Sequence, residues 1–254
     1  MNRSFPAILI VLVLCLGAIQ SAVSQDLDVK EIIRRSNDLL RGEKSYSELL
    51  MKVETPRWTR NYVMRCWTQG TERALIVISK PEKDNGSAFL KLGRQMWQYV
   101  PRVDKVIKIP PSAMLQSWMG SDFTNDDLAR ADSIVVDYEH MLLGREQVDG
   151  ADCYKIQSIP HEDAPVVWGK VLSWIDVDSF ILRRGEFYDE DGPLVKRMTS
   201  VDIRQIQGRW VSMKQVMINL ADPGHSTTLI FNNIDFDTPM PAGVFDLNQI
   251  KLPR

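Results

Sequence analysis

Hydrophobic and polar residues alternate along most of this chain, which is the pattern of strands that bury one face. Turns rich in Gly, Asp and Pro separate the alternating runs. We expect strands at Tyr46–Glu54, Trp58–Gln69, Arg73–Lys80, Ala88–Leu92, Gln95–Val100, Val103–Ile109, Ile134–Leu143, Cys153–Ile159, Lys170–Asp176, Phe180–Asp189, Leu194–Gln207, Trp210–Leu220 and Ser226–Asp237. About a dozen strands in hairpin succession predict a mainly β fold with a strongly curved antiparallel sheet or a partly closed barrel.

One long helix precedes the strands, from Asp28 to Leu40. Asp28 is placed to cap it with Glu31, and Gly42 ends it. Its apolar residues form a single stripe that needs a sheet to cover: Val29, Ile32, Ile33, Leu39 and Leu40. At the other end of the chain, the segment PMPAGVFDL is expected to lie against the sheet through Val244, Phe245 and Leu247.

The segment from Ser112 to Leu128, SAMLQSWMGSDFTNDDL, interrupts the strand pattern. It places bulky residues on a short helical spacing, and Thr124 with Asp127 predicts a short helix that ends near Arg130. The bulky residues are Met114, Leu115, Trp118, Met119 and Phe123. They either plug the end of the barrel as core or form a movable cover over an apolar cavity.

The first residues have the pattern of a secretory signal peptide. Arg3 precedes an apolar run from Ala7 to Ile19, and Ala22 and Ser24 suit cleavage before Gln25. The run is shorter than the roughly 20 apolar residues of a membrane span. We therefore expect residues 1–24 to be removed and residues 25–254 to form one domain. Cys66 and Cys153 then remain, either as a disulfide in an oxidising compartment or as two separate buried thiols.

Composition and motifs argue against several classes of function. The chain has 44% hydrophobic and 25% charged residues with a net charge of -2, so no basic field favours nucleic acid. His140, His161 and His225 lie apart from one another, and no zinc, nucleotide or hydrolase motif is present. No residue set predicts an enzyme, a metal site or a cofactor.

Three stretches in the second half resemble the LolA-like family of outer-membrane lipoprotein-sorting proteins. They are LGREQVDGADCYKI (143–156), WIDVDSFILRRGEFYDEDG (174–192) and GRWV (208–211). The stretch SWMGSDFTNDDL also resembles the branch of that family found beside export pumps. The match covers most of the mature chain.

The resemblance implies a half-open β-barrel with short helices as a lid, in the periplasm of a Gram-negative bacterium. It further implies a monomeric carrier of lipoprotein acyl chains or free lipid that works with an inner-membrane transporter and touches membranes transiently. Two alternatives remain. One is a lipid-sensing module that reports to a transporter or regulator, and the other is a structural or enzymatic periplasmic barrel with a filled core.

On this hypothesis, the five bulky residues of the 112–128 segment form the lid. Aromatic and Met side chains, which suit varied apolar shapes, would line the cavity: Trp58, Tyr62, Met64, Trp97 and Tyr99. The competing interpretation is that these residues simply fill the interior.

Overall fold

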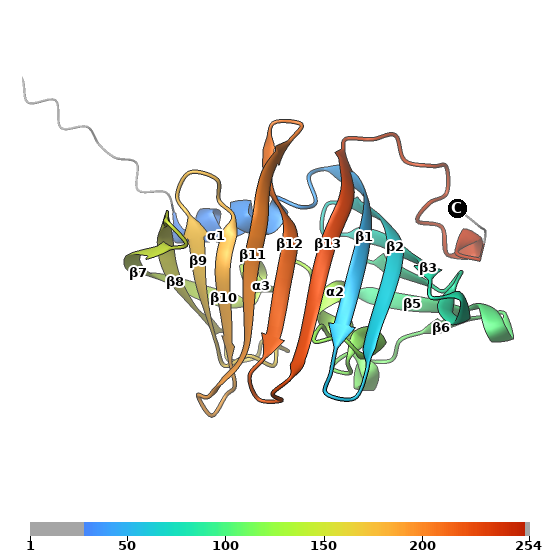
Figure 1. Ribbon diagram of the computed structural model, residues 1–254, viewed down its shortest axis with the longest axis horizontal. Helices are drawn as coiled ribbons and strands as arrows, with labels where there is room; N and C mark the ends of the chain where they lie inside the picture. The colour runs from blue at the N-terminus through green and yellow to red at the C-terminus, as the bar shows by residue number, and fades with distance from the viewer. Residues whose placement is uncertain (1–27, 252–254) are drawn as a thin grey trace, which may run out of the picture.

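The computed structural model describes residues 28–251 and contains one curved, open sheet of 13 antiparallel strands (Figure 1). The order across the sheet is β6-β5-β4-β3-β2-β1-β13-β12-β11-β10-β9-β8-β7, so that β6 and β7 are its two edges. The strands are β1 (Lys44–Glu54), β2 (Thr59–Gln69), β3 (Arg73–Lys80), β4 (Ala88–Leu92), β5 (Gln95–Val100), β6 (Lys105–Lys108), β7 (Tyr138–Val148), β8 (Ala151–Pro160), β9 (Lys170–Asp176), β10 (Leu182–Tyr188), β11 (Leu194–Ile206), β12 (Arg209–Asn219) and β13 (His225–Phe236). The predicted mainly β fold is confirmed. The predicted signal peptide lies outside the described residues.

The expected strands match the observed ones closely, with one error. The prediction of a strand from Ile134 is wrong, because residues Ser133–Val136 form the short helix α3 and β7 begins at Tyr138. The β-branched run Ile134–Val136 has the composition of a strand. Val135, however, packs against Ile32 and Ile33 of the first helix, and this tertiary contact outweighs the local preference.

Three α-helices gather on one face of the sheet, which we call the inner face (Figure 1). Helix α1 spans Val29–Asp38, and the Asp28 side chain accepts a hydrogen bond from the Lys30 backbone N–H. Glu31 does not complete a capping box there but pairs with Arg34 and Arg35. Helix α2 spans Asn125–Ala129 and has the capping box predicted from Thr124 and Asp127. Short 3-10 helices lie at Glu82–Asp84, Pro101–Val103, Pro111–Ala113, Trp118–Gly120 and Leu247–Gln249.

The two faces of the sheet are covered differently. On the inner face, α1 and α3 pack on β8 and β9, while the segment before α2 packs on β1 to β5. On the opposite, outer face, the C-terminal tail covers β2 to β4, with Val244 and Ile250 buried and Phe245 and Leu247 packed beside them. The expected docking of the tail is therefore confirmed, and β3 is covered on both faces.

Both cysteines are free and buried, Cys66 in β2 and Cys153 in β8. Burial raises the pKa of Cys66 to about 12 and that of Cys153 to about 11, so both thiols stay protonated. Of the two alternatives left open by the sequence, the structure shows two separate thiols. Within residues 28–251, no helix has the length and apolar character needed to cross a membrane.

Candidate functional site

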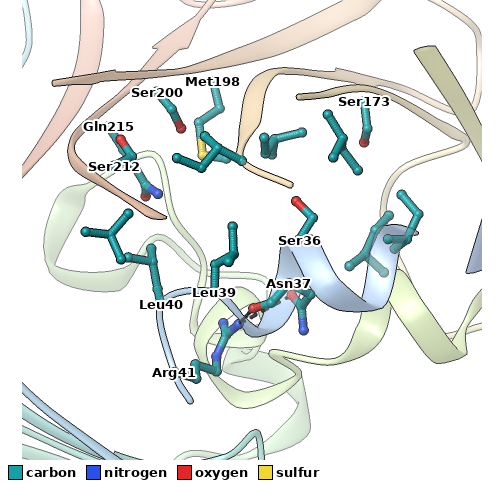
Figure 2. Close-up of a pocket in the computed structure, with 16 residues that line it drawn as sticks. Ser36, Asn37, Leu39, Leu40, Arg41, Ser173, Met198, Ser200, Ser212 and Gln215 are labelled. Atoms are coloured by element: carbon teal, nitrogen blue, oxygen red, sulfur yellow. Dashed lines mark hydrogen bonds between the residues drawn. The ribbon is translucent and has the colours of Figure 1, made fainter. Parts of the chain in front are cut away.

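A hollow of about 220 Å³ lies on the inner face between the C-terminal half of α1 and strands β9 to β12; we call it cavity A (Figure 2). Leu39 and Leu40 approach it from the helix side, and Met198 of β11 from the sheet. Hydroxyl and amide groups interrupt this apolar lining at Ser36, Asn37, Ser173, Ser200, Ser212 and Gln215. Ser173, Ser200 and Ser212 are buried, so these positions face the hollow and not bulk water.

A second hollow of about 280 Å³, cavity B, continues from cavity A toward α2. The two share the lining residues Asn37, Arg41, Ile134, Ser173, Leu182 and Met198. Cavity B also contains aromatic and sulfur-bearing side chains, including Phe123, Phe187 and Met217. Small-molecule sites are typically about 300–1,000 Å³, so each hollow alone is small, and the two adjoin along the residues that they share.

The more open cavity C, about 620 Å³, lies on the other side of cavity B. Its lining includes Met114, Leu115, Pro111 and Ile109 from the segment that precedes α2. Cavities B and C share Asp126, Arg130, Val166 and Val167. These four residues therefore form a partition between the inner space and the wider opening.

Arg130 holds this partition together. It is buried, and its Nη2 lies 2.5 Å from Asp137 Oδ2 while its Nη1 donates to the Pro165 carbonyl in the loop between β8 and β9. Asp126 lies 3.8 Å from the same guanidinium, and its burial raises its pKa. The partition is thus a buried ionic cluster that fixes the 161–169 loop against α2.

The loop between β8 and β9 also contributes Trp168 to the wall of cavity B. The Trp168 ring packs on Phe187, with ring centroids 5.5 Å apart, and Lys196 Nζ lies 5.4 Å from the Trp168 ring. Lys196 also donates to the Asp122 carbonyl in the segment before α2. Lys196 of β11 therefore connects the 161–169 loop with the segment before α2.

The structure separates the five residues expected to form the lid. Phe123 lines cavity B, and Met114 and Leu115 line cavity C. Trp118, by contrast, is only 4% exposed and packs edge-to-face on Phe89 of β4, with centroids 5.4 Å apart. Met119 packs against the same core cluster, and its carbonyl accepts a hydrogen bond from Tyr62 Oη at 3.1 Å. The space beneath Trp118 is filled, and the hollows lie beside it.

The five residues expected to line the cavity also divide into two groups. Trp58, Tyr62 and Met64 belong to the cluster beneath Trp118 on the inner face. Trp97 and Tyr99 alternate with the inner-facing Met96 on β5, so they lie on the outer face. There Tyr99 packs with the cluster under the C-terminal tail, and Lys251 Nζ lies 5.8 Å from its ring.

Sequence reasoning missed the residues that line cavities A and B. These come from the end of α1, from the inner faces of β9 to β12 and from the 165–168 loop. The apolar run Pro165–Trp168, placed between two predicted strands, is the one local signal of a covering segment.

The cavities combine apolar side chains with a smaller number of polar and charged groups. Hydroxyls, one phenol, a few cations and the carboxylates of Asp122, Asp126 and Asp127 are present, and burial raises the pKa of the Tyr138 phenol in cavity B well above its usual range. Within the described part of the chain, no group of three or more His, Cys, Asp and Glu side chains is arranged to hold a metal ion. An apolar space with dispersed hydroxyls suits a flexible, mostly apolar molecule.

Comparisons with known proteins agree with this architecture. A family model described only as uncharacterized-protein-like matches residues 70–252, more than half of the chain. No curated protein matches the sequence.

Several solved structures share the fold. A DUF1329 family protein from Desulfovibrio piger is 24% identical with a TM-score of 0.80, and the match covers 87% of this chain and 97% of that one. A putative outer membrane lipoprotein-sorting protein domain from Vibrio parahaemolyticus is 23% identical with a TM-score of 0.77, covering 87% and 97%. A LolA superfamily protein from Nitrosomonas europaea is 22% identical with a TM-score of 0.72, covering 87% and 98%. The chain therefore belongs to the family of uncharacterized proteins whose model matches it, and its fold is that of the LolA superfamily and of lipoprotein-sorting domains.

Proposed function

We propose that this protein is a periplasmic carrier that binds the acyl chains of lipoproteins or other lipids in cavities A and B and moves them toward the outer membrane. The observation that carries the proposal is the pair of adjoining, largely apolar hollows beneath α1 and α2, which the protein's own side chains leave open. The printed descriptions of two proteins of the same fold, lipoprotein sorting and LolA superfamily, support the same class of cargo.

The energetics suit a carrier. Each methylene group removed from water contributes about 0.8 kcal/mol, so a long acyl chain gains on the order of ten kcal/mol if it is fully enclosed. The serines of cavity A reduce the apolar contact below that limit. A moderate gain allows the cargo to be released as well as held.

The segment that precedes α2 and the 161–169 loop would cover the bound cargo. Met114, Leu115 and Phe123 contact the cavities, while Trp118 and Met119 anchor the segment to the sheet. Cargo would enter from cavity C past the Arg130 partition. In this proposal the protein is a monomer, an inner-membrane transporter donates the cargo, and the protein contacts membranes only transiently. No catalytic step is required.

Native mass spectrometry of the protein purified from its own periplasm, followed by lipid extraction, tests the proposal. We expect adducts with the mass of an acyl lipid. Met198→Trp, which fills the boundary between cavities A and B, should remove them. Met141→Trp, at an exposed position on β7, should keep them. A lipid-free protein that also fails to take up added acyl lipid would contradict the proposal.

A further inference from the structure

A cation without an ionic partner lies where cavities A and B meet. Arg41 follows α1, lines both cavities and is half-buried. Among residues 28–251, no carboxylate forms an ion pair with it. Asp38, one of the two acids that act on it electrostatically, is 2.9 Å from Arg34 Nη1, and the other acid is Asp132.

Most of the hydrogen-bonding capacity of this guanidinium is unused by the protein. Its Nη1 donates to the Asn37 carbonyl at 2.5 Å and lies 3.4 Å from Asn37 Oδ1 (Figure 2). Within the described chain, Nε and Nη2 make no hydrogen bond to another residue, and neither atom is sealed from solvent. A guanidinium offers five N–H donors in a planar fork that matches a carboxylate or a phosphate.

A second donor lies beside it. Asn37 Nδ2 is buried and has no hydrogen-bond partner, although Asn37 also lines both cavities. A buried donor without a partner is destabilising, so its presence beside an unpaired cation needs an explanation. An anion bound at this boundary would give Arg41 an ionic partner and offer Asn37 Nδ2 an acceptor.

The competing interpretation is that Arg41 only caps α1. Its contact with the Asn37 carbonyl does satisfy a last-turn acceptor, and a cation at a helix C-terminus is favourable. Capping, however, uses only Nη1 and leaves Asn37 Nδ2 unpaired. Desolvation lowers the pKa of Arg41, and the nearby carboxylates of Asp38 and Asp132 oppose this shift.

We infer that the cargo is an acyl chain that ends in an anionic group, a carboxylate or a phosphate, which Arg41 and Asn37 bind at the boundary of cavities A and B. This inference rests on the proposed carrier function and specifies its substrate class. The apolar residues that share the boundary, Ile134, Leu182 and Met198, would contact the first methylenes of the chain.

Calorimetric titration of the delipidated protein with four ligands of equal chain length tests this inference. They are dodecanoate, dodecyl phosphate, dodecanol and dodecylammonium, each below its micelle concentration at neutral pH. We expect at least one anion to bind about 10-fold or more tightly than dodecanol, because hydrogen bonds to charged groups are the strong ones, and dodecylammonium to bind most weakly. The tighter of the two anions distinguishes a fatty-acid cargo from a phospholipid cargo.

The outcomes separate the two proposals. If dodecanol binds as tightly as both anions, the inference fails and the carrier function stands. If no ligand of the series binds, both fail. This comparison uses only the unaltered protein and so does not depend on the folding of a variant.

A substitution then assigns the preference to its residue. Arg41→Gln should bring anion and alcohol affinities to within about 3-fold of each other, and Arg41→Lys should keep part of the difference. Arg102→Gln, at an exposed position in the Pro101–Val103 helix, is the matched control and should keep all of it. An Arg41→Gln protein that retains the full anion preference would overturn the assignment.

Discussion

Thr227 and Asp122 are 105 residues apart in sequence and form a reciprocal pair in the interior. Thr227 Oγ1 on β13 donates to Asp122 Oδ2 at 2.7 Å and accepts from the Asp122 backbone N–H at 2.9 Å. Thr227 is fully buried. This pair fixes the segment before α2 to the centre of the sheet, and therefore sets the position of Phe123 in cavity B.

Thr227→Val should lower the free energy of unfolding by about 1–3 kcal/mol, because it leaves a buried carboxylate oxygen and a backbone donor without partners. Urea denaturation measures the loss. Thr228→Val changes a neighbouring buried threonine for which the structure shows no side-chain hydrogen bond, and it should cost less. Equal losses in the two variants would contradict the role of the pair.

Trp118→Ala should lower the free energy of unfolding by about 3–5 kcal/mol, because it opens a cavity in a packed core. Leu115→Ala, in the same segment but at a side chain that is 57% exposed, should change it by less than about 0.5 kcal/mol. Thermal or urea denaturation of both variants measures the two changes in unfolding free energy. A loss below about 1 kcal/mol for Trp118→Ala would show that this side chain is a mobile cover and not an anchor.

Arg130→Met should loosen the partition between cavities B and C. Removing one partner of a buried ion pair costs about 3–5 kcal/mol, and here it also frees the Pro165 carbonyl in the 161–169 loop. Hydrogen exchange should show faster exchange in that loop, and lipid uptake should become faster than in the unaltered protein. Unchanged hydrogen exchange in the loop would show that Arg130 does not hold the partition closed.

Stability should fall as the pH is lowered through the range of a buried histidine. His140 on β7 bonds through Nδ1 to Ser158 Oγ at 2.8 Å, and its Nε2 is buried without a partner. Burial is the main cause that lowers its pKa from 6.5; Lys30 and His161 act in the same direction, and the Val135 backbone and Asp28 oppose it. The unfolded chain therefore binds this proton more readily than the folded chain. The stability that neutral His140 contributes is present above about pH 6.5 and is lost as the pH falls below it.

Urea denaturation at about pH 8 and about pH 5.5 tests this pH dependence. The decrease in unfolding free energy should be smaller in His140→Gln than in the unaltered protein. His161→Gln, at a half-exposed side chain, is the control and should keep most of the decrease. An equal decrease in all three proteins would assign the effect to other groups.

The sequence predicted the strands well because strand alternation directly reflects which residues each face buries. Ala88–Leu92 and Gln95–Val100 were predicted at their observed bounds for this reason. The helix at Ser133–Val136 was missed, since only its contact with α1 distinguishes that β-branched run from a strand.

The candidate site was harder to predict, because it depends on how distant strands are brought together. Met198 and Met217 are cross-strand partners in β11 and β12, and both line cavity B. Ser200 and Ser212 have the appearance of solvent-facing strand residues, yet they are buried toward cavity A. The aromatic residues of the first half have the stronger sequence signal, but most of their rings pack in the interior beneath Trp118 or on the outer face.

The most direct test of the central claim is to locate a bound acyl chain by photo-crosslinking. A lipid with a diazirine in its acyl chain, bound to the protein, irradiated and mapped by peptide mass spectrometry, should label residues that line cavities A and B, above all Leu182, Met198 and Met217. An excess of unlabelled lipid should suppress this labelling. Crosslinks confined to the outer face, or labelling that excess lipid does not reduce, would contradict a lipid-binding space beneath α1.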